Sequence, residues 1–419
     1  MSFLLTLAAR RRRSPVVLGI VMLALVLAVM LWPAPSPVSA TGAATISADS
    51  AHTCVVTGVG GVLCWGANNV GQLGDGQSCG LLCTTPVDAT TLTSSVVAVE
   101  LGFTHTCVLT TAGGVKCWGG NGSGQLGAAT TEDCDPDPQD FDACSTVPVD
   151  VTGLESGVVA VSAGGNHTCA LTTTGSVLCW GGTPVVVAGL ESGVASIDAG
   201  HNYTCAVTTA GGAKCWGGNT SGQLGDGTTT FSSTPVDVSG LTSGVATVSA
   251  DSAHTCVVTG VGGVLCWGSN NVGQLGDGQS CGNVFCPAPA AVSGLTSGVA
   301  VLDTGSAHTC AVTTESGVLC WGSNIFGLLG TVTTELCPTT PCGTTPLEVL
   351  GLGPKPTPTS TPVPPPTAIG GIGIFPGALG SGPDSGSTAL LTWLAAVAAG
   401  AFALGGAAWY AKRRRHPAP

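Results

Sequence analysis

The body of this sequence is poor in positive charge. Residues 41–353 contain 22 Asp and Glu but only two basic residues, Lys116 and Lys214. A protein that binds nucleic acid needs a cluster of Lys and Arg to contact phosphates. The composition therefore argues against binding of nucleic acid, or of an acidic membrane surface, through this body.

Catalytic sets and aromatic patches are also missing. Every Cys has a pairing partner, every body His belongs to a repeat, and no spacing suggests a pair of carboxylates. Aromatic residues make up only 5% of the chain. Those of the variable loops are Phe141, Phe231, Phe285 and Phe326. The sequence predicts a protein that is not an enzyme and shows no rigid aromatic patch for inhibiting one.

Apolar runs lie near both ends of the chain, and the first predicts an export signal. Four arginines, Arg10 to Arg13, precede an uncharged stretch from Val16 to Trp32, and small residues follow up to Ala40. This order is typical of a signal peptide over residues 1–40, cleaved after Ala40. Because the apolar run is long for a signal peptide, an uncleaved anchor is the alternative.

The second apolar run predicts a membrane-spanning helix over residues 388–411. The 23 residues from Thr388 to Tyr410 carry no charge, which is enough to cross a hydrocarbon core of about 30 Å. Lys412 and three arginines follow in a basic tail, residues 412–419. Since positive charge stays on the cytoplasmic side, we expect a single-pass protein of the cell membrane with a cytoplasmic C-terminus and an extracellular body.

Residues 354–387, between the body and this predicted helix, are rich in Pro, Thr, Gly and Ser. Seven prolines lie between Pro354 and Pro366 alone. Such a segment cannot form a core and prefers an extended, semi-stiff backbone. It predicts a stalk.

The 20 cysteines fall into ten local pairs. An even, paired set behind an export signal is typical of disulfides. In a cytosolic protein the same spacing would raise zinc binding as the alternative. Six pairs share one spacing: Cys54 with Cys64, Cys107 with Cys117, Cys169 with Cys179, Cys205 with Cys215, Cys256 with Cys266, and Cys310 with Cys320. Four lie in loops: Cys79 with Cys83, Cys134 with Cys144, Cys281 with Cys286, and Cys337 with Cys342.

Aligning the chain on the six evenly spaced pairs reveals a repeat of about fifty residues, with one shorter step. Periods of this length are typical of propellers and solenoids. Within a unit, β-rich runs such as residues 53–57 and 62–65 flank a Gly-rich turn, which predicts a hairpin with its two cysteines opposite each other. An inner run and an outer run complete four strands, which is one propeller blade.

The predicted fold is all-β, a propeller over residues 41–353 with six blades, and seven as the alternative. The body begins with an inner-strand run, residues 44–48, and ends with an outer-strand run, residues 346–350. The first run would supply an inner strand and the last run an outer strand of the same blade. We therefore expect the two to complete one blade and close the ring, which would leave no open strand edge.

The repeated motifs resemble the regulator of chromosome condensation repeat, whose known members form β-propellers. The likeness covers about residues 44–351: Cys-Trp-Gly recurs in all six units and Gly-Gln-Leu-Gly in four. The third unit lacks the long loop that follows, and the sixth has Leu328 where others carry Gln. The resemblance implies a propeller. It also raises guanine-nucleotide exchange on a small GTPase, the activity of the best-known member, as a second functional hypothesis.

The residues that recur in each unit have a structural interpretation. We expect the repeated histidines to satisfy backbone groups, with a ring of metal ligands as the alternative, and the tryptophans to pack between blades. The Gly-Gln-Leu-Gly-Asp-Gly segments are predicted turns. The histidines are His52, His105, His167, His201, His254 and His308. The tryptophans are Trp65, Trp118, Trp180, Trp216, Trp267 and Trp321.

One loop of the second unit is strongly acidic, and alternating carboxylates of this kind can bind calcium. Pro138 occupies the place of the glycine that a calcium loop needs at its sixth position, and Cys144 that of the final glutamate. A solvated loop is therefore the prediction, with calcium as the alternative and no other cofactor expected. The acidic residues are Asp133, Asp135, Asp137, Asp140 and Asp142.

The leading functional hypothesis is a non-catalytic binding or adhesion module displayed on the cell surface, with an extracellular protein or glycan as its partner. Recognition commonly lies on loops of a rigid scaffold. The candidate loops differ between units and are stapled by cysteines, at residues 79–83, 134–144, 281–286 and 337–342. Nucleotide exchange would require a cytosolic body, which the export signal argues against. Inhibition of a secreted enzyme and a structural role in the cell envelope are two further hypotheses.

Overall fold

The computed structural model describes residues 43–49, 51–77, 83–130, 132–134, 143–279 and 285–352. These residues form strands and one short 3-10 helix, η1 (Ile325–Gly327). None of the described residues forms a helix that is long and apolar enough to cross a membrane. The predicted signal peptide, stalk, membrane-spanning helix and basic tail lie outside the described residues.

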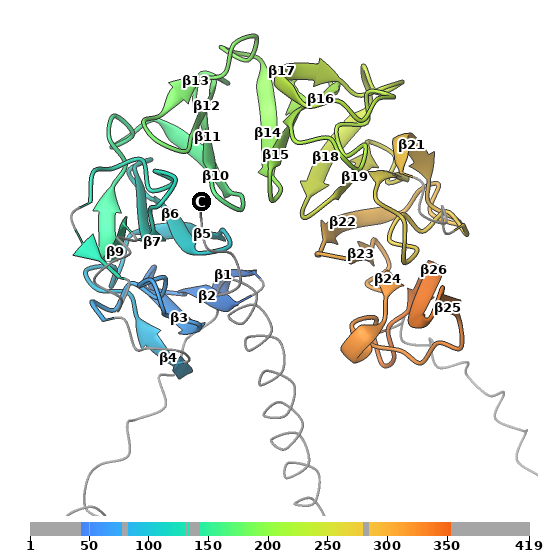
Figure 1. Ribbon diagram of the computed structural model, residues 1–419, viewed down its shortest axis with the longest axis horizontal. Helices are drawn as coiled ribbons and strands as arrows, with labels where there is room; N and C mark the ends of the chain where they lie inside the picture. The colour runs from blue at the N-terminus through green and yellow to red at the C-terminus, as the bar shows by residue number, and fades with distance from the viewer. Residues whose placement is uncertain are drawn as a thin grey trace, which may run out of the picture. The chain divides into compact units, whose positions relative to one another are not determined.

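The strands form six antiparallel sheets, which we call blades 1 to 6 in chain order (Figure 1). Blade 1 consists of β1 (Ala43–Ala48), β2 (His52–Thr57), β3 (Val62–Gly66) and β4 (Cys83–Asp88). Blade 2 consists of β5 (Val96–Leu101), β6 (His105–Thr110), β7 (Val115–Gly120), β9 (Ala143–Asp150) and, at its edge, β8 (Glu132–Asp133). Blade 3 consists of β10 (Val158–Ala163), β11 (Thr168–Thr172), β12 (Val177–Trp180) and β13 (Val185–Val186).

The remaining three blades repeat this plan. Blade 4 consists of β14 (Val194–Ala199), β15 (Tyr203–Thr208), β16 (Ala213–Gly217) and β17 (Ser232–Asp237). Blade 5 consists of β18 (Val245–Ala250), β19 (His254–Thr259), β20 (Val264–Gly268) and β21 (Cys286–Ala291). Blade 6 consists of β22 (Val299–Thr304), β23 (His308–Thr313), β24 (Val318–Ser323), β26 (Thr340–Glu348) and, at its edge, β25 (Leu336–Cys337). The all-β, six-bladed prediction is confirmed.

The central hairpin of each blade forms as the sequence predicts. In blade 1, β2 pairs with β3 so that Cys54 faces Cys64, with their Cα atoms 4.1 Å apart. The turn depends on Gly60, which has a φ of +80°, a value that favours glycine. A Cβ atom added at this position would lie 2.8 Å from the amide nitrogen of Ser95. The chain leading into blade 2 therefore passes directly over this turn.

Eight of the ten predicted cysteine pairs are disulfides in the structure. They are Cys54–Cys64, Cys107–Cys117, Cys134–Cys144, Cys169–Cys179, Cys205–Cys215, Cys256–Cys266, Cys310–Cys320 and Cys337–Cys342. Cys83 and Cys286 are also disulfide-bonded. Their predicted partners, Cys79 and Cys281, lie outside the described residues. The described part of the chain contains no free cysteine, so it offers no thiolates for the zinc alternative.

Five apolar cores lie between consecutive blades, and each contains the tryptophan of the later blade. These residues are Trp118, Trp180, Trp216, Trp267 and Trp321. This confirms the predicted packing between blades for five of the six tryptophans. Trp65 of blade 1, which has no preceding blade, is half-buried.

A repeated set of hydrogen bonds accompanies this packing. The backbone oxygen of Gln72 in blade 1 accepts from Trp118 Nε1 at 2.9 Å and from Thr106 Oγ1 at 2.8 Å. The same arrangement recurs at Gln125, Gln223 and Gln274. A Cβ on Gly74 would lie 2.6 Å from Trp118 Nε1, so the last glycine of Gly-Gln-Leu-Gly makes room for the indole of the next blade.

The predicted closure of the ring by one shared blade is wrong. β1 pairs with β2 in blade 1, where Ile46 lies opposite Val55, and β26 pairs with β24 in blade 6. Each blade takes its inner strand from the residues just before its own hairpin. Pairing across a short turn costs far less chain entropy than pairing across the whole body. The terminal runs thus belong to two separate, complete blades.

Candidate binding face and central carboxylates

All long loops of the blades emerge at one end of the sheets. Because the strands are antiparallel, the turn between the first and second strands shares its end with the loop between the third and outer strands. We call this end the loop face. The described cysteines of the four predicted Cys-stapled loops lie at this end: Cys83, Cys134, Cys144, Cys286, Cys337 and Cys342. The second-to-third-strand turns, including Glu315, lie on the opposite face.

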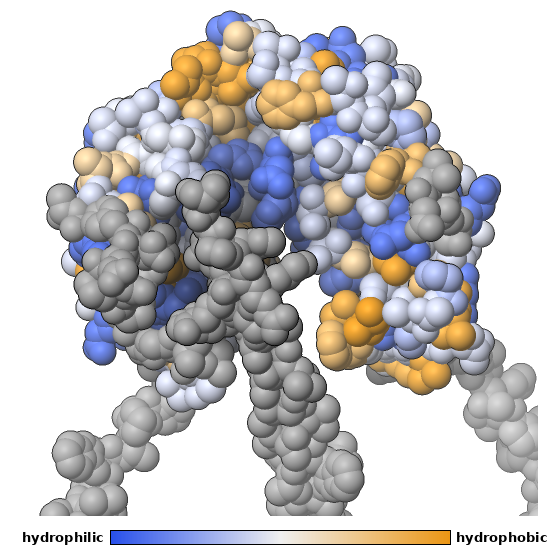
Figure 2. All heavy atoms as spheres, in the orientation of Figure 1, coloured by the Kyte–Doolittle hydropathy of each residue, from blue (hydrophilic) through white to orange (hydrophobic). Residues whose placement is uncertain are grey.

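Six inner-strand residues share one position at the centre of the blades, because each pairs with the first cysteine of its hairpin. Serine and carboxylate alternate along the series. The residues are Ser47, Glu100, Ser162, Asp198, Ser249 and Asp303. Figure 2 shows hydrophilic residues gathered around this centre. This set was not predicted from the sequence.

Two of these carboxylates link neighbouring blades. Asp198 accepts from Ser162 Oγ of blade 3 at 3.1 Å and from the amide of Ala250 in blade 5 at 2.7 Å. Ser249 Oγ lies 3.3 Å from Asp303 Oδ1 of blade 6. The series is therefore both a source of negative charge and a structural connection between inner strands.

Burial and mutual repulsion shift the titration of the central acids. Burial, together with the charges of Asp198 and Asp303, raises the pKa of Glu100 to about 8. Burial raises the pKa of Asp198 to about 6, although its hydrogen bonds oppose the shift. Burial and the neighbouring charges of Asp49, Asp198 and Asp303 raise the pKa of Asp251, on the loop face, to about 7.

No described lysine or arginine compensates this charge. The two lysines of the described residues, Lys116 and Lys214, lie on third strands and pair with Asp150 and Asp237 of the adjacent outer strands at 2.6 Å. The centre of the loop face thus carries several carboxylates with no basic side chain of the described chain beside them.

An aromatic pair lies at the rim of this centre. Phe103, in the β5–β6 turn, is 47% exposed. It meets the exposed ring of His201, in the β14–β15 turn, edge to face with centroids 5.9 Å apart. In the intervening turn of blade 3, Gly165 donates its amide to the His201 backbone oxygen at 3.0 Å. The neighbouring carboxylates, and not the ring edge, suit a cationic group, because the edge of an aromatic ring carries partial positive charge.

The repeated histidines have a structural role, but they bond to side chains of the next blade and not, as predicted, to backbone groups of their own blade. Nε2 of His52, His105, His167 and His254 lies 2.8–2.9 Å from a threonine hydroxyl of the next blade. Thr106, Thr168 and Thr309 give their own hydroxyl proton to a Gln backbone oxygen. In those three interfaces the histidine must therefore donate from Nε2. Burial lowers the pKa of these four histidines to about 3 or 4, so they are neutral at pH 7. Each Nε2 is engaged at a different interface, and no three of these rings come together as a metal site among the described residues.

His201 lies two residues before the position that the other repeated histidines occupy. Tyr203 takes the histidine's place in blade 4, and its hydroxyl donates to the backbone oxygen of His254 at 2.6 Å. Release from the interface leaves His201 exposed on the loop face. The signal was the Tyr-Thr-Cys sequence where other blades have His-Thr-Cys.

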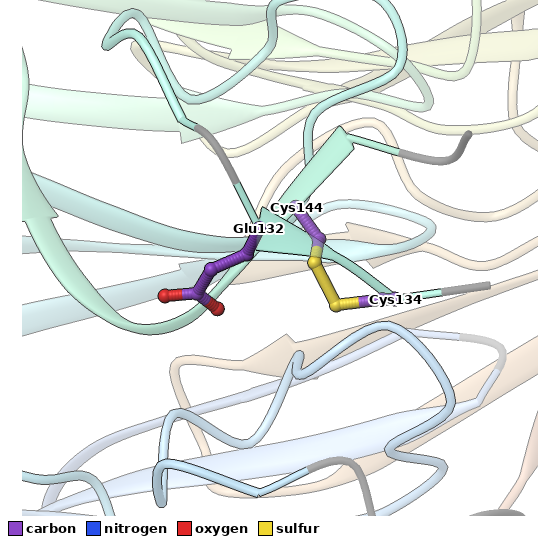
Figure 3. Close-up of side chains that lie close together, drawn as sticks. All are labelled: Glu132, Cys134 and Cys144. Carbon is purple, nitrogen blue, oxygen red and sulfur yellow. A yellow bond between two sulfur atoms is a disulfide. The ribbon is translucent and has the colours of Figure 1, made fainter. Parts of the chain in front are cut away.

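Two stapled loops bring a carboxylate close to a cysteine pair. Glu132 lies beside Cys134 and Cys144 (Figure 3), and Glu335 lies beside Cys337 and Cys342. In both groups the sulfur atoms are bonded to each other, so neither offers thiolate ligands for a metal. The glutamates instead accept from the amides of Thr146 and Thr344, at 2.7 and 3.0 Å. These clusters fasten the loops to the outer strands.

The acidic loop of blade 2 falls largely outside the described residues. Asp133 is exposed in β8. The other four predicted calcium ligands, Asp135, Asp137, Asp140 and Asp142, are not among the described residues, so calcium binding here stays a prediction.

The repeats match a known family. Regulator of chromosome condensation (RCC1) repeats match residues 59–109, 112–171, 215–258 and 261–312. A second RCC1 repeat description matches residues 96–125, 194–223 and 299–327, which raises the matched share above half of the chain. This chain belongs to the RCC1 repeat family.

Relatives within the RCC1 family differ widely in size. The chain is 30% identical over 284 residues to the probable E3 ubiquitin-protein ligase HERC6 of Homo sapiens, covering 65% of this chain and 22% of HERC6. It is 28% identical over 323 residues to the ultraviolet-B receptor UVR8 of Arabidopsis thaliana, covering 71% and 70%. The chain thus spans only about a fifth of HERC6.

A solved structure shares the fold. Human WBSCR16 superposes with a TM-score of 0.62 at 23% identity, covering 74% of this chain and 81% of that one. The RCC1 resemblance predicted from the sequence is confirmed.

Proposed function

We propose that this protein is a non-catalytic binding module whose loop face takes up a positively charged segment of a partner protein outside the cell. The observation that carries the proposal is the group of central carboxylates, above all Glu100 and Asp251, without a described lysine or arginine beside them. A cationic segment would lower the raised pKa values of these acids and so favour their ionised form, which would attract it.

The distribution of variation supports a binding role. Disulfides, interblade tryptophans and buried histidines repeat from blade to blade, whereas the long loops differ in length and sequence and share one face. Loops of this kind on a rigid scaffold commonly determine the partner. The proposal needs no catalytic step, because the repeated histidines are engaged between blades and every described cysteine is disulfide-bonded.

The proposal includes the location that the sequence predicts: a body exported behind a signal peptide, held by a stalk and a single membrane-spanning helix. Disulfides throughout the body support an oxidising compartment. Nucleotide exchange on a GTPase is the second candidate, and it would require the body to lie in the cytosol. The two candidates are distinguished by treating intact cells with protease and a membrane-impermeant thiol reagent, before and after reduction. Exported protein is cleaved and labels only after reduction, whereas a cytosolic body is protected.

Binding is tested with charged peptides and the oxidised full chain in a mild detergent. We expect a fluorescent lysine decapeptide to bind, more weakly at high salt, and a glutamate decapeptide not to bind. Glu100→Gln combined with Asp251→Asn should weaken lysine-peptide binding several-fold. Glu315→Gln on the opposite face is the matched control and should leave it unchanged. Equal effects of the central and control substitutions would refute the proposed site.

A further inference from the structure

One of the five interfaces between blades lacks the loop that the other four contain. In those four, the Gly-Gln-Leu-Gly loop of the earlier blade packs against the later blade, whereas blade 3 runs from Trp180 through two glycines directly into Pro184. The core between blades 3 and 4 forms nevertheless, from apolar residues of both blades. We call the place of the missing loop, bordered by Thr204, Trp216 and Ser233 of blade 4, the open loop position.

The two glycines of such a loop approach the next blade closely. Between blades 4 and 5, a Cβ added to Gly222 would lie 2.6 Å from the Cα of Pro287 in the outer strand. A Cβ added to Gly225 would lie 2.6 Å from Nε1 of Trp267. The equivalent glycines have similar contacts between blades 1 and 2 and between blades 5 and 6. A side chain at either place would therefore hold the loop away from the next blade.

The two residues between these glycines supply a hydrogen-bond acceptor and an apolar side chain. The backbone oxygen of Gln223 accepts from Trp267 and Thr255. Leu224 is fully buried in the core between blades 4 and 5. The equivalent leucines of the other three interfaces are also fully buried: Leu73, Leu126 and Leu275. Because the acceptor belongs to the main chain, the residue that carries it can vary, and the pattern that such a position selects is Gly-x-Leu-Gly.

Blade 4 presents the same donors toward the open loop position, but blade 3 offers them no main-chain acceptor. Nε1 of Trp216 has no hydrogen-bond partner among the described residues, and Trp216 is 8% exposed whereas Trp267 is completely buried. The hydroxyl of Thr204 lies 2.8 Å from His167 Nε2 and 3.6 Å from Cys169 Sγ, and no described backbone oxygen accepts from it. The core between blades 3 and 4 also contains no leucine of this kind.

The outer strand of blade 4 is uncovered at the same place. In blades 2, 5 and 6 the equivalent residues, Thr146, Pro287 and Thr344, are half-buried, and their backbone oxygens accept from a glycine amide of the preceding blade's loop at 2.9–3.0 Å. Their counterpart in blade 4 is Ser233, which follows the residue paired with Gly217. Ser233 is exposed, and no described amide of blade 3 bonds to it.

We propose that the open loop position binds a turn of a partner protein with the pattern Gly-x-Leu-Gly, which completes this interface as the chain's own loops complete the other four. The leucine of the turn packs against Trp216 and is removed from water. The backbone oxygen of the variable residue accepts from Trp216 Nε1 and from Thr204, and a following amide donates to the backbone oxygen of Ser233. The first glycine lies against the outer strand and the last against the indole.

The chain's own loops are a poor source of this turn in a second copy. Their leucines are fully buried between blades, so a copy that supplied one would have to open an interface of its own. The open loop position shares the loop face with the central carboxylates, but none of its three bordering residues is charged. The inference therefore goes beyond the cationic segment proposed above and does not depend on it.

A fluorescent peptide tests the proposal on the oxidised full chain in mild detergent. The peptide is Asn-Thr-Ser-Gly-Gln-Leu-Gly-Asp-Gly-Thr, the sequence of residues 219–228. This segment supports its own turn, because the Leu224 amide donates to Asn219 Oδ1 at 3.0 Å and Asn219 Nδ2 donates to Asp226 Oδ1 at 3.3 Å. We expect it to bind, and a peptide with Asp in place of Leu to bind about tenfold more weakly or less. Equal binding of the two peptides would refute the proposed turn.

One substitution in the protein tests the location. Trp216→Phe removes the indole donor and should weaken binding of the peptide several-fold, while the urea midpoint shows that the variant is folded. Trp65→Phe, at the equivalent position of blade 1, is the matched control and should leave binding unchanged. An equal loss in both variants, or a loss only in Trp65→Phe, would overturn the assignment to the interface between blades 3 and 4.

Other occupants give different results in the same experiment. The stalk sequence contains Gly377-Ala378-Leu379-Gly380. A peptide that binds only after Leu379→Asp would overturn the proposal in favour of the chain's own stalk. A wild-type protein that dimerises in sedimentation, and that Trp216→Phe makes monomeric, would overturn it in favour of a second copy. No binding of the peptide to wild type or to Leu379→Asp would overturn the site itself.

Discussion

In four of the five interfaces, one main-chain oxygen accepts hydrogen bonds from two side chains of the next blade. The Gln223 oxygen accepts from Trp267 Nε1 at 2.8 Å and from Thr255 at 2.9 Å, both fully buried. Blade 3 lacks the Gly-Gln-Leu-Gly loop, and Trp216 of the next blade has no described hydrogen bond although it is only 8% exposed. We expect Trp267→Phe to destabilise the fold by about 1–3 kcal/mol more than Trp216→Phe. Urea unfolding of the two variants measures this difference, and equal losses would contradict it.

The central carboxylates show what sequence reasoning could have found at this scale. Ser47, Glu100, Ser162, Asp198, Ser249 and Asp303 each lie seven residues before the first cysteine of a hairpin. The alignment on cysteines therefore already contained the alternation. Their convergence could not be read from it, because residues tens of positions apart meet only when the inner strands assemble. Tyr203 was similarly visible in the alignment, but its bond to His254 of the next blade was not.

The disulfide hairpin is the unit that the sequence predicted best at the scale of elements. Two cysteines ten residues apart, with a Gly-rich turn between β-rich runs, leave one register that places them opposite each other. We expect Cys256→Ala with Cys266→Ala to destabilise the protein by about 2–3 kcal/mol, because the bridge restricts the unfolded chain. The edge bridge closes a shorter loop, so Cys337→Ala with Cys342→Ala should cost less. Denaturant midpoints of both double variants test the order, and the reverse order would count against it.

The prediction that the two terminal strands share one blade was wrong, and the reason lies in how single strands pair. The runs at 44–48 and 346–350 looked like two halves of one blade, because a repeat aligned on its cysteines has no natural starting point. In the structure β1 precedes its own hairpin, with Ser47 opposite Cys54, and blade 6 has its own inner strand, β22. Local pairing at 44–48 therefore leaves a complete blade at each end of the series.

Two sets of buried ionisable groups have opposite effects on how the stability of the whole molecule depends on pH. The histidines between blades, such as His105 and His254, have folded-state pKa values near 3 because they are buried. The unfolded chain takes up protons on them as the pH falls below about 6.5, so their contribution to stability decreases toward acid pH. The central acids act in the other direction. Burial raises the pKa of Glu100 to about 8 and that of Asp251 to about 7, so the folded state holds protons that the unfolded state has already lost.

Stability of the oxidised protein should therefore peak near about pH 6 and decline on both sides. Above about pH 7 the histidines are neutral in both states. The decline up to about pH 8 arises because folded Glu100, and Asp251 up to about pH 7, still hold protons that the unfolded chain has lost. Glu100→Gln should flatten this alkaline limb and steepen the acid limb above about pH 4.5, because Glu100 opposes the histidines over that range. Glu155→Gln, which removes an exposed carboxylate outside the centre, is the control and should keep the wild-type profile. Melting temperatures between pH 5 and 8.5 measure both limbs. A flat wild-type profile above pH 6.5 would show that the central acids are already ionised in the folded protein.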